Sequence, residues 1–207
     1  MKREEKNKIT RRRILDSALS EFSAKGYGAS SINTICAAQD ISKGIVYHYF
    51  ETKDVLFLAC VEECFQLLTE YIRENMKSQG SKENGMEDYF AIRTRFFQTH
   101  SVYQRIFCDA VISPPSHLRE EIQERKRDFD KLNIRILEQL LMPFSLRSSI
   151  SRDDVIETFR QFQDFINIRY QMADTKEQAF EAREEKCRKA LDILLYGVIE
   201  RKEFENG

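Results

Sequence analysis

Residues 26–57 read GYGASSINTICAAQDISKGIVYHYFETKDVLF, with two short helix signals on either side of a tight turn and then the start of a longer helix. Gly26 can close a preceding helix, because glycine readily adopts the left-handed conformation that residues with a Cβ atom resist. Ser30 or Ser31 can then cap the next helix by accepting a hydrogen bond on its hydroxyl. The stretch therefore predicts one helix that ends near Gly26 and a second that begins soon after it.

The turn and the helix that follows it have signals of their own. Asp40 stands at the turn, where a short polar side chain tolerates positive φ, and Ser42 can cap a short helix. Val46 and Phe50 are four residues apart and can hold this helix to a core. Its outer side is left with Lys43, Gly44, Tyr47 and His48. Such an exposed polar helix suits the major groove of DNA, which admits one helix.

The order of these residues also carries a resemblance. Gly-Tyr at 26–27, Ser-Lys-Gly-Ile-Val-Tyr-His-Tyr-Phe at 42–50 and Lys53 before an apolar run resemble the N-terminal domain of the TetR family of bacterial transcriptional regulators. The resemblance covers residues 9–60, and the remainder is linked to the family only by its length, helical pattern and position. Ile45 departs from the family, in which Thr is frequent here, and it can contact a thymine methyl group instead.

The resemblance implies a set of DNA contacts from the three helices of such a domain. Predicted phosphate contacts come from Thr10, Arg11, Ser31, Tyr49 and Lys53. Predicted base-edge contacts come from Asn33, Lys43, Gly44, Tyr47 and His48. Gly44 belongs to this set because its lack of a side chain lets the backbone approach the duplex. The expected partner is double-stranded DNA with a palindromic operator, read by two domains one DNA turn apart.

The net charge of −1 is distributed unevenly along the chain. Residues 1–53 hold ten Lys and Arg against six Asp and Glu, so this part carries +4 and the remainder −5. The positive excess is densest in KREEKNKITRRR, residues 2–13, which can neutralise DNA phosphates by releasing counterions. A charged and merely solvated N-terminus is the alternative.

The composition and the long stretches without helix-breaking residues predict an all-α protein. The chain has 207 residues, 42% of them hydrophobic, and no glycine lies between Gly85 and Gly197, which leaves room for long helices. With the resemblance, the expected organisation is an N-terminal three-helix helix-turn-helix DNA-binding domain at 1–52 plus a C-terminal helical ligand-binding and dimerisation domain at 53–207. The longest apolar run, 55–61, is far shorter than the roughly 20 residues that cross a bilayer, so we expect a cytoplasmic protein without a membrane partner.

Helical periodicity predicts where the helices of this chain lie. The first, 9–25, has an apolar stripe, and 53–76 is apolar nearly all round, which is typical of a helix covered on several sides. A polar loop is expected at 78–85. The other predicted helices are 86–99, 101–112, one long helix from the prolines at 114 and 115 to 142, then 152–172 and 177–203.

The last two predicted helices carry apolar stripes that exceed the needs of one small domain. In proteins similar to this one these helices pair with their symmetry mates, which implies a two-fold homodimer. The predicted interface consists of Phe159, Ile166, Leu191, Leu194, Leu195 and Val198. The alternative is that both stripes only face their own domain.

Aromatic residues are abundant between the loop and the last helix, and polar side chains stand among them at helical spacing. Family members generally bind an inducer in this region, so the resemblance implies a pocket for a small hydrophobic molecule. The candidate lining residues are Phe90, Arg93, Phe96, Phe97, His100, Phe107, Phe129, Phe162, Phe165 and Arg169. For any one of them, a place in the core or in a solvated ion pair is the alternative.

Signals for catalysis are absent from the sequence. It contains no nucleotide-binding glycine loop, no G-x-S-x-G, no H-E-x-x-H and no Glu-x-x-His pair, so we predict no enzyme activity, no cofactor and no metal site. Five cysteines at irregular spacing favour reduced thiols, although Cys60 and Cys64 are one turn apart and could sense oxidation.

The most direct interpretation of the whole sequence is a dimeric repressor that a small hydrophobic ligand releases from its operator. A regulator of the same fold that is switched by a protein partner or by thiol oxidation is the alternative. A helical enzyme is a remote one.

Overall fold

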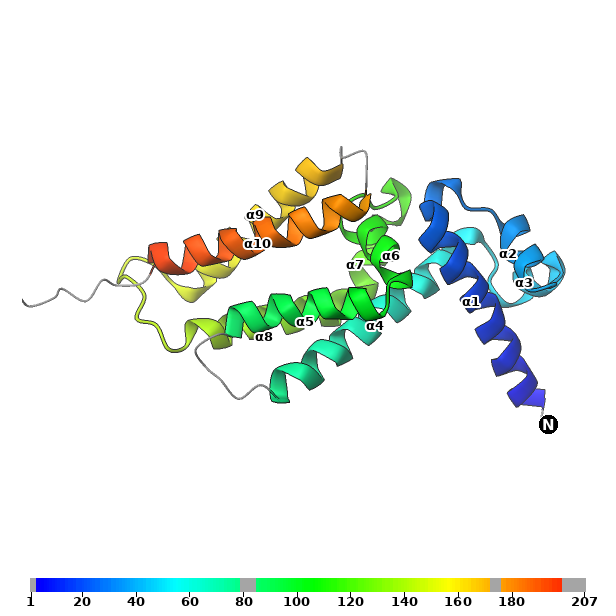
Figure 1. The fold of residues 1–207 in the computed structure, drawn as a ribbon, viewed down its shortest axis with the longest axis horizontal. Helices are drawn as coiled ribbons and strands as arrows, with labels where there is room; N and C mark the ends of the chain where they lie inside the picture. Colours follow the sequence, from blue (N-terminus) through cyan, green and yellow to red (C-terminus); the bar gives the residue numbers. More distant parts are fainter. Residues whose placement is uncertain (1–2, 79–84, 172–175, 199–207) are drawn as a thin grey trace, which may run out of the picture.

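The computed structural model describes residues 3–78, 85–171 and 176–198. Helices dominate this part of the chain and confirm the all-α prediction, with α1–α3 gathered at one end of the molecule and α4–α10 forming its longer part (Figure 1). We refer to α1–α3 as the head and to α4–α10 as the body. The elements are α1 (Arg3–Ala29), α2 (Ile32–Ala38), α3 (Lys43–Tyr49), α4 (Lys53–Ser78), α5 (Gly85–Thr99), α6 (Val102–Val111), the 3-10 helix η1 (Ser116–Leu118), α7 (Arg119–Arg125), α8 (Arg127–Leu141), α9 (Arg152–Gln171) and α10 (Lys176–Val198).

Helix α1 begins earlier than the predicted residue 9 and bends where the sequence predicts its end. Glu4 and Glu5 lie in its first turn, where negative charge stabilises a helix N-terminus. The predicted apolar stripe is buried throughout: Ile14, Leu15, Ala18, Leu19 and Phe22. At Gly26 the backbone has φ 73° and ψ 169°, so the helix is interrupted there before one more turn to Ala29.

The turn between α2 and α3 follows the local signals closely. The Ser31 hydroxyl accepts a hydrogen bond from Thr34 N at 3.2 Å and caps α2, and the Ser42 hydroxyl accepts one from Ile45 N at 3.3 Å and caps α3. Asp40 has φ 49°, the positive value expected at this turn. Three short-range predictions are therefore confirmed.

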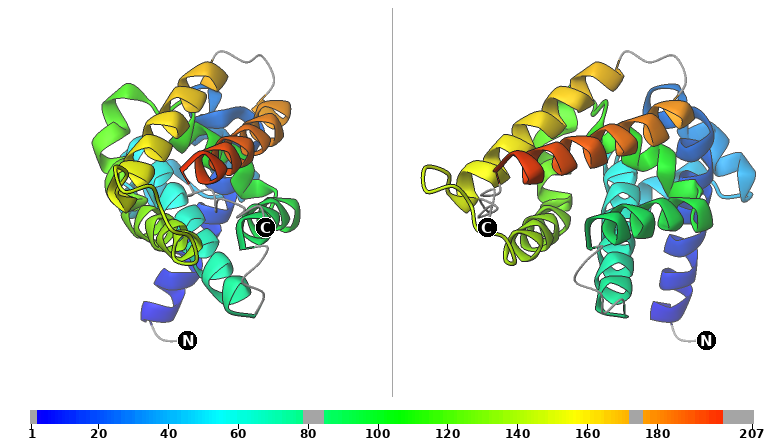
Figure 2. Two further views of the ribbon diagram at one scale, coloured as in Figure 1. Left: turned by 90° about the vertical axis from the view of Figure 1, so that its left-hand side faces the viewer. Right: turned by 60° about the vertical axis from the view of Figure 1, so that its left-hand side comes forward.

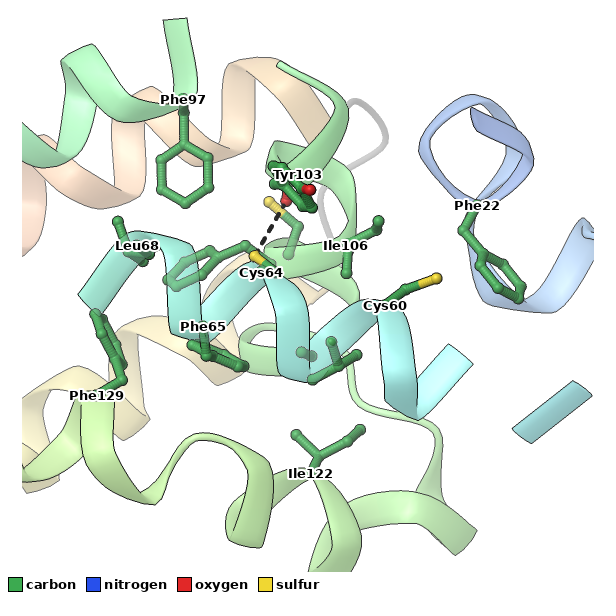
Figure 3. Packing of buried hydrophobic residues seen from close by; sticks show 14 of the residues in the cluster. Phe22, Cys60, Cys64, Phe65, Leu68, Phe97, Tyr103, Ile106, Ile122 and Phe129 are labelled. Carbon is green, nitrogen blue, oxygen red and sulfur yellow. Dashed lines mark hydrogen bonds between the residues drawn. The ribbon is translucent and has the colours of Figure 1, made fainter. Parts of the chain in front are cut away.

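Helix α4 runs from the head into the centre of the body. The Phe65 ring lies 5.3 Å from the ring of Phe129 in α8 and 5.8 Å from that of Phe107 in α6. Figure 3 shows Phe97 of α5 and Ile122 of α7 on opposite sides of the same helix. Most of the apolar surface predicted for α4 is thus buried against helices on several sides, while Val55 and Leu67 remain exposed.

The single helix predicted to end at residue 142 is two helices, so this prediction is wrong. Lys126 separates α7 from α8 with φ −92° and ψ 0°, and its Nζ lies 2.7 Å from the Asp130 carboxylate. The break lets Ile122 of α7 and Phe129 of α8 both pack in the core with α4. No glycine or proline marks this position, so the sequence has no local signal for the break.

Helices α9 and α10 lie against each other along one side of the body (Figure 2). Their observed spans agree with the predicted ones within the described residues, which end at residue 198. Across those residues, no helix has both the length and the apolar character needed to cross a membrane.

Candidate DNA-binding site

The outward face of α3 is the most exposed functional surface of the head. Val46 is completely buried and Phe50 nearly so, which fixes the helix by its inner side. The predicted base-contacting residues Lys43, Gly44, Tyr47 and His48 are all exposed. A short helix that is anchored by its buried side and exposed on its opposite side can enter a DNA groove without rearrangement of the head.

The candidate surface also includes the first turn of α2. Asn33, a predicted base contact, is exposed. Ser31 is half-buried, and its hydroxyl is occupied by the α2 cap and by the Thr34 hydroxyl at 2.9 Å. Its backbone N–H donates to the Glu21 carboxylate at 3.3 Å, which leaves the remaining first-turn amides to give this helix end a positive character that suits a phosphate.

Two of the predicted phosphate donors have partners inside the protein. The Tyr49 hydroxyl donates to Asn7 Oδ1 at 3.1 Å, and the Thr10 hydroxyl donates to Lys6 O at 3.0 Å. Each hydroxyl has one proton, so a phosphate contact requires exchange of these bonds. The guanidinium of Arg11 lies 5.1 Å over the Phe50 ring and remains exposed, so that it can turn towards a phosphate.

Lys53 occupies a structural position that its sequence context does not show. Its Nζ donates to Ser30 O at 2.9 Å and lies 4.4 Å over the ring of Tyr27. The side chain is half-buried and ties the start of α4 to the end of α1. A change at Lys53 should therefore disturb the attachment of the head as well as any phosphate contact.

Part of the basic N-terminal run is also used within the protein. Arg12 forms ion pairs with Asp16 and with Glu63 of α4, and these hydrogen bonds raise the pKa of its guanidinium. Arg13 donates to Gln39 O at 2.8 Å, beyond the end of α2. Within the described part of this run, Arg3, Lys6, Lys8 and Arg11 are exposed cations that could reach phosphates.

The head is fastened to α6 through backbone groups beside Gly26. The Asp109 carboxylate accepts a hydrogen bond from Tyr27 N at 2.9 Å, and Arg105 donates to Lys25 O at 3.2 Å. A Cβ atom at Gly26 would lie 2.8 Å from Asp109 Oδ2 and 2.9 Å from Arg105 Nη2. The glycine thus allows both the unusual backbone conformation and the close approach of α6. The sequence indicated only the glycine, and it did not show that Asp109 lies beside it.

A second set of contacts joins the same region to α4 and η1. The Tyr27 hydroxyl donates to Asp54, and His117 Nε2 lies 3.2 Å from that hydroxyl and 3.3 Å from the Asp54 carboxylate. Burial, followed by the bond to Asp54, raises the pKa of Tyr27 to about 12, so it stays a donor at neutral pH. The Phe57 ring packs 5.2 Å from Phe22 and 4.8 Å from Tyr27. Head and body therefore share one continuous core.

The predicted pocket residues divide into two groups. Six are buried together in the body: Phe90, Arg93, Phe96, Phe97, Phe107 and Phe129. His100 is exposed and stacks on Phe96 at 4.7 Å, while Phe162 and Phe165 are 42% and 60% exposed on α9. Arg169 lies outside the residues whose side chains are described. The structure therefore brings six of the ten together and places three at the surface.

Arg93 is the unusual member of the buried group. Its guanidinium lies 5.4 Å from the ring centre of Tyr89 and 5.6 Å from those of Phe107 and Phe129. It donates to the Tyr89 hydroxyl at 3.0 Å and to Glu184 at 3.1 Å. Burial by itself would lower the pKa of Arg93, but the Glu184 carboxylate reverses the direction and raises it. A charge so deep in the body requires this partner.

The predicted dimer residues lie mostly against their own protomer where they are described. Leu191 is 3% exposed, and Phe159 and Leu194 are half-buried against the body core. Ile166, Leu195 and Val198 lie outside the described side chains. Among the side chains of these helices that the structure describes, the large exposed apolar ones are Phe162, Phe165 and Ile193, the last of them 71% exposed.

The cysteines are all buried, and they are free thiols. Burial raises the pKa of Cys60 and Cys64 above the ordinary value of a thiol. Oxidation proceeds through the thiolate, so these two side chains are in their unreactive form at neutral pH. Over the described residues, no three His, Cys, Asp or Glu side chains come close enough to hold a metal ion.

Comparisons with known proteins agree with this geometry. Residues 14–60 match the family described as "Bacterial regulatory proteins, tetR family". The chain is 22% identical over 151 residues to the biofilm operon icaADBC HTH-type negative transcriptional regulator IcaR of Staphylococcus epidermidis, which covers 72% of this chain and 78% of that protein.

Solved structures share the fold over nearly the whole chain. A putative TetR-family transcriptional regulator from Syntrophomonas wolfei has a TM-score of 0.65 and 18% identity, covering 95% of this chain and 100% of its own. FadR from Bacillus subtilis in complex with stearoyl-CoA has a TM-score of 0.62 and 16% identity, covering 90% and 98%. The helix-turn-helix head, at residues 14–60, thus matches the tetR family of bacterial regulatory proteins, and the chain as a whole shares the fold of solved proteins described as members of that family.

Proposed function

We propose that this transcriptional regulator is a dimeric repressor that binds a palindromic operator with α3 and is released from it by a small hydrophobic ligand. The observation that best supports this proposal is the exposed outer face of α3. The inner side of the helix is anchored in the core by Val46 and Phe50. The similar protein from Staphylococcus epidermidis is named a negative regulator, which favours repression. The proposed division is a DNA-binding domain at 1–52 and a ligand-binding and dimerisation domain at 53–207.

Exposed aromatic residues support the dimer. Phe162 and Phe165 stand on α9 with ring centres 6.3 Å apart, and Ile193 projects from the neighbouring α10. Grouped apolar side chains at a surface favour an interface. A two-fold axis through α9 and α10 would present two heads to the two half-sites of a palindrome.

Continuity between body and head supports a ligand switch. Helix α6 contributes Phe107 to the aromatic interior of the body and, one half-turn later, Asp109 to the backbone of the head. A ligand that displaces α6 would move α1 with it and alter the spacing of the two heads. By reciprocity, DNA would weaken ligand binding by the same factor, typically 5- to 150-fold.

Selection from a random duplex library tests the operator proposal. We expect enrichment of two inverted half-sites about one DNA turn apart, bound with an affinity that falls steeply as salt concentration rises. The binding mixture should contain the full chain without added compounds. Recovery of sequences with no common half-site would reject the proposal.

The Gly44→Ala variant separates DNA contact from stability. A Cβ atom at Gly44 meets nothing within 4 Å in the free protein and alanine favours a helix over glycine, so the variant should be as stable as the original protein or more stable by up to about 1 kcal/mol. On the operator the added methyl group should collide with the duplex and cost about 1 to 3 kcal/mol of binding free energy. Fluorescence anisotropy with labelled operator measures this, and unchanged affinity would remove Gly44 from the interface.

Tyr47→Ala provides the matching test of base recognition. The side chain is exposed, so its removal should leave stability unchanged and weaken binding to the selected operator by about 1 to 3 kcal/mol. Binding to unrelated duplexes should change much less. Equal losses on both kinds of DNA would assign Tyr47 to phosphate contact instead.

Compounds are then screened for release of the operator. A hydrophobic molecule that raises the melting temperature of the free protein should also weaken its binding to labelled operator. If stabilising compounds leave operator affinity unchanged within twofold, the protein-partner alternative replaces the ligand switch.

A further inference from the structure

A hollow of about 460 Å³ lies between α5 and α10 on the body. Phe90 of α5 and Phe180 of α10 give it apolar walls, and both are buried. Glu184 of α10 also lines it, although only 5% of this residue is exposed. The hollow therefore combines an apolar interior with one deeply placed carboxylate, a usual composition for small-molecule sites.

The two oxygens of Glu184 have different surroundings. Oε1 accepts hydrogen bonds from Arg93 Nη2 at 3.1 Å and from Arg183 Nη1. Oε2 is buried and has no hydrogen-bond partner among the described residues. Leaving a charged acceptor buried without a donor is unfavourable, so this oxygen is a ready acceptor for an O–H or N–H group.

Charged side chains around the hollow restrict which class of molecule can supply this hydrogen-bond donor. A cation would approach the guanidinium groups of Arg93 and Arg183, which already neutralise Glu184. An anion would meet Glu184 itself and the carboxylates of Glu181 and Glu185, which also line the hollow, while the lining cation Arg188 is already paired with Glu185. A neutral donor satisfies Oε2 without either repulsion.

We propose that this hollow binds a neutral aromatic or alicyclic molecule whose single O–H or N–H group donates to Glu184 Oε2. The inference rests on the proposed ligand-responsive function and specifies the chemistry of its ligand. The apolar part of the molecule lies against Phe90 and Phe180, and the carboxylate selects the polar group. Recognition thus depends on one buried acceptor rather than on apolar contact alone.

The walls of the hollow are continuous with the contact to the head. The Phe180 ring lies 4.8 Å from Phe97 and 6.0 Å from Phe107 of α6. Two residues after Phe107, Asp109 accepts the hydrogen bond from Tyr27 N of the head. A molecule that displaces Phe180 therefore presses on the helix that holds α1.

Four probes with one ring system test the proposal on the full chain at pH 7. They are naphthalene, 2-naphthol, 2-naphthoate and the 2-naphthylmethylammonium cation, with dissociation constants measured by calorimetry. We expect 2-naphthol to bind at least tenfold more tightly than the other three. Tightest binding of the anion or the cation, equal binding of naphthalene, or binding of none of the four would overturn the proposal.

The variants Glu184→Gln and Glu185→Gln form a matched pair on the same helix. Glu184→Gln should reduce the preference for 2-naphthol over naphthalene to within twofold, whereas Glu185→Gln, at the rim beside Arg188, should leave it unchanged. Ala91→Phe fills the hollow from an exposed position and should abolish binding of all four probes even if Glu184→Gln fails to fold. Retained binding in Ala91→Phe would place the probes elsewhere and reject the site.

Operator binding is measured separately in the same preparations. If 2-naphthol binds as expected but does not release the operator, the hollow is supported as a binding site and the release mechanism is rejected. If the protein without probes selects no operator, the proposed function fails independently of the hollow.

Discussion

Replacement of Gly26 by alanine is expected to lower the free energy of unfolding by roughly 2 to 6 kcal/mol. With φ 73° and ψ 169°, this backbone conformation is essentially restricted to glycine, and forcing another residue into it costs roughly 1 to 3 kcal/mol. The new Cβ atom would also displace the buried Asp109 carboxylate from Tyr27 N, at roughly 1 to 3 kcal/mol more. Urea denaturation followed by circular dichroism measures the loss.

Gly28→Ala is the control for this experiment. A Cβ atom at Gly28 meets nothing within 4 Å, and the residue is exposed, so the change should be neutral or stabilise the protein by up to about 1 kcal/mol. Equal stability of the two alanine variants would show that the approach of α6 to Gly26 does not hold the head.

The second large effect is expected from Phe165→Arg. Phe165 is 60% exposed in one protomer, so arginine should not disturb the fold, but it would place an unpaired charge in a two-fold interface through α9 and α10. We expect a monomer with an unchanged circular dichroism spectrum. Operator affinity should fall about 100-fold or more, towards the level of nonspecific binding, since a monomer contacts one half-site.

Leu67→Arg is the matched control, because Leu67 is an exposed apolar residue of α4, outside the proposed interface. Analytical ultracentrifugation of both variants and the original protein gives the oligomeric state. A wild-type monomer at micromolar concentration, or a Phe165→Arg dimer, would contradict the proposed interface.

Local signals in the sequence predicted the head well. A serine cap and a positive φ at Asp40 are decided by bonds within a few residues, so the turn between α2 and α3 could be inferred without tertiary knowledge. The exposed side of α3 followed equally from the spacing of Val46 and Phe50. Sequence therefore located the candidate DNA-binding surface.

Features that depend on distant residues could not be predicted in this way. The break at Lys126 has no local signal, because it arises from packing of α7 and α8 against α4. Lys53 has the sequence position of a phosphate contact, yet its bond to Ser30 O exists only once α1 and α4 meet. Phe162 and Phe165 look like core residues by type, and only the three-dimensional arrangement shows them at the surface.

The attachment at Gly26 determines how this regulator could be re-engineered. A chimera cut at the α3–α4 connection would separate Phe22 from Phe57 and Tyr27 from Asp109, so a transplanted head would arrive without the groups that fix its orientation. New operator specificity is better introduced by substituting the exposed residues of α3 within this protein. Those side chains lie outside the shared core, and their replacement leaves the mechanical coupling to the body intact.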